Sequence, residues 1–360
     1  MDYASRVNAV RSSFPAEIDG LHLYIYDVFD ENPKANFRYL TGFSGSTGDL
    51  LLTRDKALVF FDSRYTIEAL KTVSNIYELR PVSDNSREIT HAIAELGIKR
   101  LGVIGATTTL DRAEFLKYNG IQVKRLADIV RVLRAIKSPQ EIELIRRAVA
   151  STEAGLLSTY EQIRYGMTEQ EIARVFEKSL PLGSRLAFPS IVISGENTAL
   201  PHGQPGTRKV YAGDIIQFDV GAHIDGYAAD VSRVVVIGKP NQLQKRMYRA
   251  VKAAMEEAAQ HYRIGVSTLQ PILCADKVLR RRKFPKIPHG LGHGLGMETH
   301  EFPFLHMGVN DNIFRAGNVV TNEPGIYIEG VGGMRIEEDI LVTENGPEFL
   351  TKLTNELIEL

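Results

Sequence analysis

The sequence predicts a small α/β domain followed by a larger α+β domain with an antiparallel sheet. The chain has 360 residues, and at about 150 residues per domain this length corresponds to about two domains. Its first third alternates short apolar runs with amphipathic stretches, and its remainder combines helical segments with strand pairs that carry hairpin signals. We expect the two domains to span residues 1–130 and 131–360.

Four apolar runs of the first domain are predicted strands, at residues 21–26, 50–53, 57–61 and 101–105. Amphipathic segments between them predict helices at residues 67–73 and 89–96. This alternation of strands and helices is the basis of the α/β prediction.

A long helix is predicted to begin the second domain. Ser138 can cap it, Pro139 occupies its first turn, and Glu141 stands three residues beyond the cap, as in a capping box. The apolar residues that follow keep a helical period: Ile142, Ile145, Ala148 and Val149. The junction between the domains is therefore placed at about residues 126–137.

The rest of the second domain is predicted to be mixed. A second helix is expected at residues 169–179, strands from 191 to 238, a helix at 241–262, and further strands to the end. The hairpin signals favour an antiparallel sheet.

Composition excludes several functional classes. The hydrophobic content of 44% and charged content of 24% are typical of a compact soluble protein, and a net charge of -1 gives no field to hold nucleic acid or an anionic membrane. Cys274 is the only cysteine, which excludes an intrachain disulfide and favours a reducing compartment. Asp2 and Arg6 stand where a signal peptide needs an apolar core. We therefore expect a cytoplasmic protein with no nucleic-acid or membrane partner.

Two glycine-rich segments do not match nucleotide-binding motifs. Residues 42–48 lack the Lys-Ser/Thr ending of a phosphate loop, and residues 290–296 lack the dinucleotide-binding spacing. The first segment is predicted to be a tight bend between strands.

The segment 215–237 places two aspartates in a predicted hairpin. Asp225-Gly226 is a strong two-residue turn signal, and the register that it sets puts Asp219 opposite Ser232. Asp219 and Asp230 then point to the same face of the sheet. A single aspartate in a strand lies more often on a solvated face, so this pair alone does not establish a site.

A second pair of acids lies near the C-terminus. Glu323 and Glu337 each stand on a strand-like segment, with Gly332-Gly333 predicted as the turn into the second segment. Four acids on inner strands would repel one another unless cations neutralise them. Carboxylates with one imidazole suit divalent manganese, cobalt, iron or zinc.

The imidazole can come from any of three nearby histidines, His289, His293 and His300, and spacing does not decide among them. The glycines beside them argue against a helical zinc motif and favour a backbone that approaches a buried site closely.

The ordered set of acids and one histidine resembles the five metal ligands of the metallopeptidases that share the creatinase and methionine aminopeptidase fold, nicknamed pita-bread. The set comprises Asp219, Asp230, His293, Glu323 and Glu337, including the spacing within each acid pair. Residues 36–48 and 61–66 resemble the creatinase-type N-terminal domain. The resemblance implies an α/β creatinase-type domain followed by an α+β pita-bread metallopeptidase domain.

The segment 289–301 and Arg335 are similar to the signature of the proline-specific branch, which comprises aminopeptidase P and prolidase. Three residues depart from the family pattern. Thr299 replaces Ile or Val, Asn322 replaces an apolar residue, and Phe304 replaces an arginine that dipeptidases often carry. Because that arginine could hold a dipeptide's carboxylate, its absence favours aminopeptidase P over a strict dipeptidase.

By resemblance, two divalent ions, most commonly manganese, would be bridged by Asp230 and Glu337. Asp219 would chelate one ion, and His293 with Glu323 would complete the other. The resemblance gives Glu323 a further role as proton shuttle.

The remaining roles also come from the resemblance. His202 and His300 would donate hydrogen bonds to the substrate and to the oxyanion. His289 would line the pocket for the proline ring, and Arg335 would orient the product side or pair with a ligand carboxylate. Relatives also imply a homodimer.

Two alternatives stay open at this point. One fold hosts several chemistries, so a family member acting on a small non-peptide C–N or C–S bond is the competing enzyme. A peptide-binding or scaffold protein without turnover is the competing non-enzyme, and it is disfavoured because the ligand set is complete.

Overall fold

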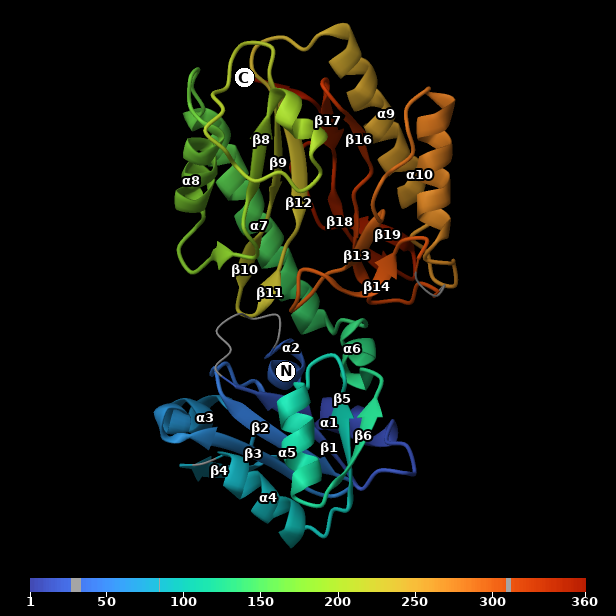
Figure 1. The fold of residues 1–360 in the computed structure, drawn as a ribbon. Helices are drawn as coiled ribbons and strands as arrows, with labels where there is room; N and C mark the ends of the chain where they lie inside the picture. The colour runs from blue at the N-terminus through green and yellow to red at the C-terminus, as the bar shows by residue number, and fades with distance from the viewer. Residues whose placement is uncertain (27–33, 84, 309–311) are drawn as a thin grey trace. The chain divides into compact units, whose positions relative to one another are not determined.

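The computed structural model describes residues 1–26, 34–83, 85–308 and 312–360, and Figure 1 traces the chain. The chain forms two compact units, Met1–Arg134 and Ala135–Leu360. No helix among these described residues is long and apolar enough to cross a membrane.

The first unit is built on a mixed sheet of strand order β4-β3-β2-β1-β5-β6. Its strands are β1 (Gly20–Ile25), β2 (Gly48–Thr53), β3 (Ala57–Asp62), β4 (Glu78–Val82), β5 (Arg100–Ile104) and β6 (Gln122–Leu126). Its helices are α1 (Tyr3–Ser12), α2 (Ala35–Thr41), α3 (Thr66–Thr72), α4 (Asn85–Glu95), α5 (Leu110–Tyr118) and α6 (Ile129–Arg134). The predicted α/β arrangement is confirmed.

The predicted strands correspond to β1, β2, β3 and β5, and the predicted helices to α3 and α4. The sequence missed β4 and β6, which form the two edges of the sheet. Both edge strands are largely exposed or half-buried, so their side chains lack the apolar pattern of a buried strand. Helices α1, α2, α5 and α6 were also missed.

The glycine-rich segment 42–48 does not connect two strands, which corrects the prediction. Gly42 ends α2 in the left-handed conformation, with φ of 76°, and its N–H donates to Arg38 O at 2.8 Å. The segment therefore joins a helix to β2. A glycine that ends a helix and a glycine in a strand bend give the same local signal.

The second unit begins with the predicted long helix, α7 (Pro139–Gln162). The predicted capping box is present: Ser138 N donates to Glu141 Oε2 at 3.0 Å, and Ser138 Oγ accepts from Glu141 N. The further helices are α8 (Glu169–Ser179), α9 (Gln242–Ala259) and α10 (Gln270–Arg281). Helices α8 and α9 confirm their predictions.

Helix α10 lies where the sequence predicted only strands. Its N-cap residue, Leu269, makes no side-chain cap, so the capping signal that marked α7 is missing here. The usable signals were Pro271 in the first turn and the buried positions Ile272, Ala275 and Leu279, which recur at helical spacing.

Two larger sheets form the framework of the second unit. One has the order β20-β12-β9-β8 and the other β14-β13-β15-β18-β19. Smaller sheets join β11-β10-β7 and β16-β17. The strands are β7 (Arg185–Leu186), β8 (Ile191–Ser194), β9 (Ile215–Val220), β10 (Ala222–Ile224), β11 (Tyr227–Ala228), β12 (Val231–Val236), β13 (Gly292–Gly294), β14 (Glu301–Leu305), β15 (Val319–Asn322), β16 (Gly325–Ile328), β17 (Gly332–Arg335), β18 (Glu338–Thr343), β19 (Gly346–Phe349) and β20 (Ile358–Glu359).

Each of the two larger sheets is backed by its own helix pair (Figure 1). Side chains of α7 and α8 form a buried cluster with β8, β9 and β12, including Leu156, Phe176 and Phe218. Side chains of α9 and α10 form a second cluster with β15, β17 and β18, including Met255 and Ile340. Because side chains alternate along a strand, Asp219 and Ser232 lie on the face opposite the α7–α8 cluster, together with apolar residues such as Val234.

Candidate metal centre and substrate pocket

Asp219 and Asp230 lie on the hairpin that the sequence predicted. Asp225 and Gly226 have φ of 50° and 95°, so both turn residues are left-handed, as a two-residue hairpin of this type requires. The ladder pairs Ser232 with Asp219, which confirms the predicted register. Asp219 is in β9, and Asp230 directly precedes β12.

Glu323 directly follows β15 and Glu337 directly precedes β18, which are neighbouring strands of the other large sheet. Strands β15 and β18 pair Asn322 with Glu338, and the same register continued by one residue puts Glu323 opposite Glu337. The turn before Glu337 differs from the prediction, because Gly332 and Gly333 are the first residues of β17 rather than its turn. Strands β16 and β17 are joined instead through residues 329–331.

The structure accounts for Asn322, which the sequence did not explain. Its side chain is fully buried, and Nδ2 donates a hydrogen bond to Met255 O on α9 at 3.0 Å. Asn322 therefore ties β15 to the helix behind it, while Glu323 follows at the end of the strand.

His293 is held on β13 by a very close approach of neighbouring backbone. A Cβ atom on Gly292 would lie 2.2 Å from Thr321 O, and one on Gly294 would lie 2.4 Å from Phe302 O. No side chain fits at either position, so the glycines allow the backbone approach that the sequence indicated. Both glycines flank the histidine that faces the acids.

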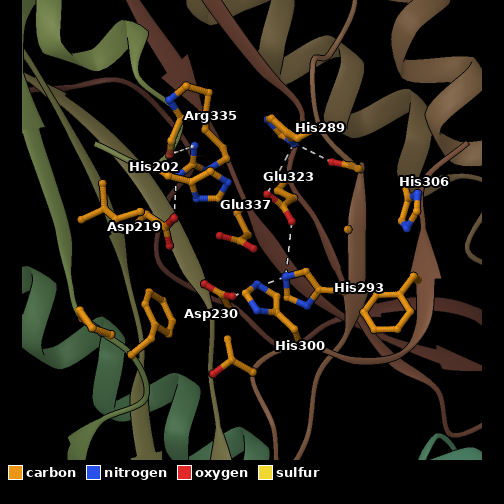
Figure 2. A pocket seen from close by; sticks show the side chains of 18 of the residues that line it. His202, Asp219, Asp230, His289, His293, His300, His306, Glu323, Arg335 and Glu337 are labelled. Carbon is orange, nitrogen blue, oxygen red and sulfur yellow. Dashed lines mark hydrogen bonds and ion pairs between the residues drawn. The ribbon is translucent and has the colours of Figure 1, made fainter. Parts of the chain in front are cut away.

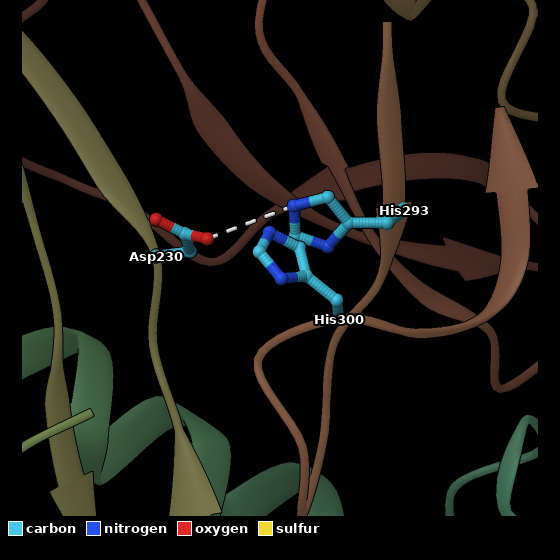
Figure 3. A group of neighbouring side chains, drawn as sticks. All are labelled: Asp230, His293 and His300. Carbon is cyan, nitrogen blue, oxygen red and sulfur yellow. Dashed lines mark ion pairs between the residues drawn. The ribbon is translucent and has the colours of Figure 1, made fainter. Parts of the chain in front are cut away.

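The predicted ligand side chains converge. His293 Nε2 lies 3.6 Å from Asp230 Oδ2 and 3.5 Å from Glu323 Oε1. Three sets of candidate ligand atoms lie within 4.8 Å of one another: Asp230 with His293 and His300, His293 with Glu323 and Glu337, and Asp219 with Asp230 and Glu337. Figure 2 shows these side chains facing one another, and Figure 3 shows the first set.

The acids lie too close together to be charged without a partner. Burial, then the charges of Glu337 and Asp219, raises the pKa of Asp230 well above its usual value. Burial, then Glu323 and Asp219, does the same for the pKa of Glu337. Asp230 Oδ1 is buried without a hydrogen-bond partner among the described residues.

The donor set fits a divalent cation. Burial raises the pKa of Glu323 to about 7 and lowers that of His293 to about 3, with His300 contributing to the second shift. His293 is therefore neutral and can offer a lone pair, as a metal ligand must. A cation would satisfy the orphaned oxygen and remove the repulsion among the carboxylates.

Arg335 heads a chain of hydrogen bonds that ends at His289. Its Nη2 lies 2.5 Å from Asp219 Oδ2, and its Nη1 donates to Tyr327 OH at 2.7 Å. Tyr327 OH lies 2.9 Å from His289 Nε2, and His289 Nδ1 lies 2.6 Å from Gly290 O. Both nitrogens of the His289 ring are thereby engaged, so the ring orientation is fixed.

Burial lowers the pKa of His289 to about 4, so this imidazole is neutral. Arg335 forms the ion pair that the sequence gave as one of two alternatives. Sequence reasoning missed Tyr327 altogether, and it named Ser232 only as the residue opposite Asp219. Ser232 Oγ accepts from Arg335 Nε at 2.9 Å and lies 2.9 Å from Glu337 Oε2.

A cavity of about 390 Å³ opens onto these groups. It is lined by every predicted site residue: His202, Asp219, Asp230, His289, His293, His300, Glu323, Arg335 and Glu337. The structure thus brings the whole predicted set together. Phe188, Phe304 and His306 also line the cavity, and the sequence gave no role to Phe188 or His306.

Two family models match the chain. The model of metallopeptidase family M24 matches residues 143–344, and that of the creatinase/prolidase N-terminal domain matches residues 22–136. A relative named Xaa-Pro dipeptidase, from Pyrococcus horikoshii, is 32% identical over 332 residues, which are 91% of this chain and 93% of the relative.

Solved structures show the same similarity. The Xaa-Pro dipeptidase from Bacillus anthracis superposes with a TM-score of 0.93 at 31% identity, covering 100% of both chains. The X-Pro aminopeptidase from Thermotoga maritima gives a TM-score of 0.89 at 34% identity, covering 95% of this chain and 98% of that one.

Proposed function

The chain belongs to metallopeptidase family M24, with a creatinase-type N-terminal domain and a pita-bread catalytic domain, and from this premise we propose that it is an Xaa-Pro dipeptidase. The observation that carries the proposal is the convergence of four carboxylates and a neutral imidazole on one cavity. Relatives of nearly full length that are named Xaa-Pro dipeptidase support the choice of substrate.

Five residues would hold two divalent cations, for which we propose manganese: Asp219, Asp230, His293, Glu323 and Glu337. Bound divalent cations supply Lewis-acid polarisation of the scissile carbonyl and a water of lowered pKa. Asp230, His293 and Glu337 each belong to two of the three close ligand sets, so these three side chains would be central to holding the cations.

The residues of the chain then position the substrate and move the proton. We assign to Glu323 the transfer of a proton from the attacking water to the leaving proline nitrogen. His202 and His300 line the same cavity and would donate hydrogen bonds to the substrate and to the developing oxyanion.

Recognition of proline follows from what the bond lacks. The amide before proline has no N–H, so a site cannot grip it by a hydrogen bond to that group. Both ring nitrogens of His289 are engaged by Tyr327 and Gly290. The imidazole therefore has a fixed orientation and offers the substrate a surface to pack against, with no free donor. We propose that the proline ring packs against the His289 imidazole, and that Arg335 orients this imidazole through Tyr327.

The dipeptidase proposal replaces the preference for aminopeptidase P that Phe304 suggested. Phe304 lines the pocket and brings no cation to a carboxylate. The names of the similar proteins nevertheless favour a dipeptidase more often than an aminopeptidase. Xaa-Pro aminopeptidase remains the second candidate, because the Thermotoga maritima structure is 34% identical.

The decisive experiment compares three substrates after metal removal and reconstitution with Mn²⁺. We expect cleavage of Ala-Pro to exceed that of Ala-Pro-Ala, and Ala-Ala to be left intact. A preference for the tripeptide would support the aminopeptidase instead. Cleavage of none of them by the metal-loaded protein would contradict both candidates.

Three further features are part of the proposal. We propose that the two domains span residues 1–130 and 131–360, and that the second domain carries out the reaction. We propose that the protein is a homodimer, and its molar mass in solution, measured by light scattering after size exclusion, would test this. A cytoplasmic location is testable by cell fractionation.

A further inference from the structure

The groups that line the pocket differ in whether their donors are already used. Arg335 donates to Asp219, Tyr327 and Ser232. Both nitrogens of His289 are engaged, and His293 faces the acids. These side chains therefore have little capacity left for a charged group on the substrate.

His306 is different. Its Nδ1 accepts a hydrogen bond from Gly308 N at 3.1 Å, and its Nε2 has no protein partner among the described residues. An imidazole that accepts at Nδ1 carries its proton at Nε2. His306 thus offers one free N–H donor on a half-buried ring that lines the cavity.

The position of His306 places this donor on the side of the pocket where His289 stands. A Cβ atom on Gly290, the residue after His289, would lie only 3.2 Å from His306 Cβ. His306 follows β14 two residues after Phe304, and the two rings lie 6.4 Å apart. Figure 2 shows His306 on the side of the pocket away from Asp219 and His202.

A bound Xaa-Pro dipeptide would place its C-terminal carboxylate on the side of the pocket where His306 lies. Once the proline ring lies against His289, as proposed, the carboxylate of the same residue follows within one bond of the ring. A longer peptide has an uncharged amide at that point. The donor that meets this position therefore decides between the two kinds of substrate.

We propose that Nε2–H of His306 donates a hydrogen bond to the free carboxylate of an Xaa-Pro dipeptide, which makes His306 the residue that sets the preference for dipeptides. The inference rests on the proposed function. A hydrogen bond to a charged acceptor is stronger than one to a neutral amide, and its loss corresponds to roughly 10- to 100-fold in kcat/KM.

The test uses the full chain reconstituted with Mn²⁺ and compares Ala-Pro with Ala-Pro-amide, which differs only in the charge of its C-terminal group. The variant His306→Phe keeps an aromatic ring and removes the donor, and His306→Gln keeps a side-chain N–H. His91→Phe is the matched control, because His91 is exposed on α4.

We expect the wild type and His91→Phe to prefer Ala-Pro over the amide by about tenfold or more in kcat/KM. In His306→Phe the ratio should fall to about one, chiefly through a higher KM for Ala-Pro. His306→Gln should restore part of the preference. A variant that was only partly unfolded would cleave both substrates more slowly, by the same factor.

The inference is overturned if the wild type does not distinguish the two substrates, or if His306→Phe keeps the wild-type ratio or slows both substrates equally. These outcomes leave the proposed function intact, because Ala-Pro is still cleaved. If the wild type cleaves neither substrate, the proposed function fails and the inference fails with it.

Discussion

The ammonium nitrogen of Lys137 lies 2.7 Å from Oε1 of Glu301, and both side chains are 1% exposed. Glu301 begins β14 and directly follows His300, whose ring centroid lies 4.2 Å from that of His293. Lys137, which precedes the N-cap of α7, is thereby paired with the strand that begins beside the proposed metal ligands. A buried pair of this kind depends on both partners, because either charge alone would be unsolvated.

Replacing Lys137 should therefore destabilise the second unit strongly. Lys137→Met leaves the Glu301 carboxylate buried without its cation, and we expect a loss of about 3–5 kcal/mol, measured as a lower Tm. The double variant Lys137→Met/Glu301→Gln should recover part of this loss. Lys286→Met, at an exposed lysine, is the control. A Tm of Lys137→Met equal to that of the control would contradict the prediction.

Asp230→Asn should abolish both activity and metal binding. The change removes a carboxylate that belongs to two of the close ligand sets and is almost fully buried. Asp225→Asn is a matched control, because Asp225 occupies a left-handed turn position that asparagine accepts, and its side chain is 63% exposed. Metal content by elemental analysis and hydrolysis of Ala-Pro are the measurements. A fully active Asp230→Asn protein would rule out the proposed centre.

Metal removal should lower the thermal stability of the protein. Cations bind the assembled carboxylates of the folded chain and relieve their repulsion, so Mn²⁺ at about 100 times its Kd should add about 2.7 kcal/mol. The measurement is Tm after treatment with chelator and after titration with Mn²⁺. Asp230→Asn should show a much smaller shift. If neither chelator nor Mn²⁺ changes the wild-type Tm, the site does not bind the ion.

The first unit should lose stability at acid pH because of His22. Its ring is fully buried, which lowers its pKa below 6.5 although its Nε2 lies 2.7 Å from Asp49 Oδ1. Arg112 also pairs with Asp49, and its positive charge further lowers the pKa of His22. The unfolded chain therefore binds a proton that the folded chain does not. Stability is undiminished above pH 6.5 and falls as the pH is lowered toward the pKa of the folded state.

Amide hydrogen exchange of β1 and β2 in the full chain measures this effect between about pH 7 and about pH 5. After correction for the intrinsic exchange rates, His22→Gln should show a smaller loss of protection than the wild type. His91→Gln, at an exposed histidine, should behave as the wild type does. Equal pH dependence in the wild type and His22→Gln would contradict the assignment to His22.

Local signals predicted those parts of the fold whose interactions are close in sequence. The capping box at Ser138 and Glu141 and the hairpin at Asp225-Gly226 each involve a few neighbouring residues, and both are present in the structure. The same logic failed where one local signal suits two structures. Gly42 ends a helix although a strand bend was expected, and α10 begins without the side-chain cap that marked α7.

The sequence by itself determined which residues we propose for the chemistry, because their types and their order are written in the chain, and the hairpin register follows from a two-residue turn. Only the tertiary structure decided how they act together. Glu323 and Glu337 come within reach of Asp219 and Asp230 because two separate sheets meet, where Glu337 N donates to Ser232 O at 3.1 Å. Tyr327 reaches His289, and His306 lines the pocket, through packing between segments distant in sequence, and no local pattern encodes such contacts.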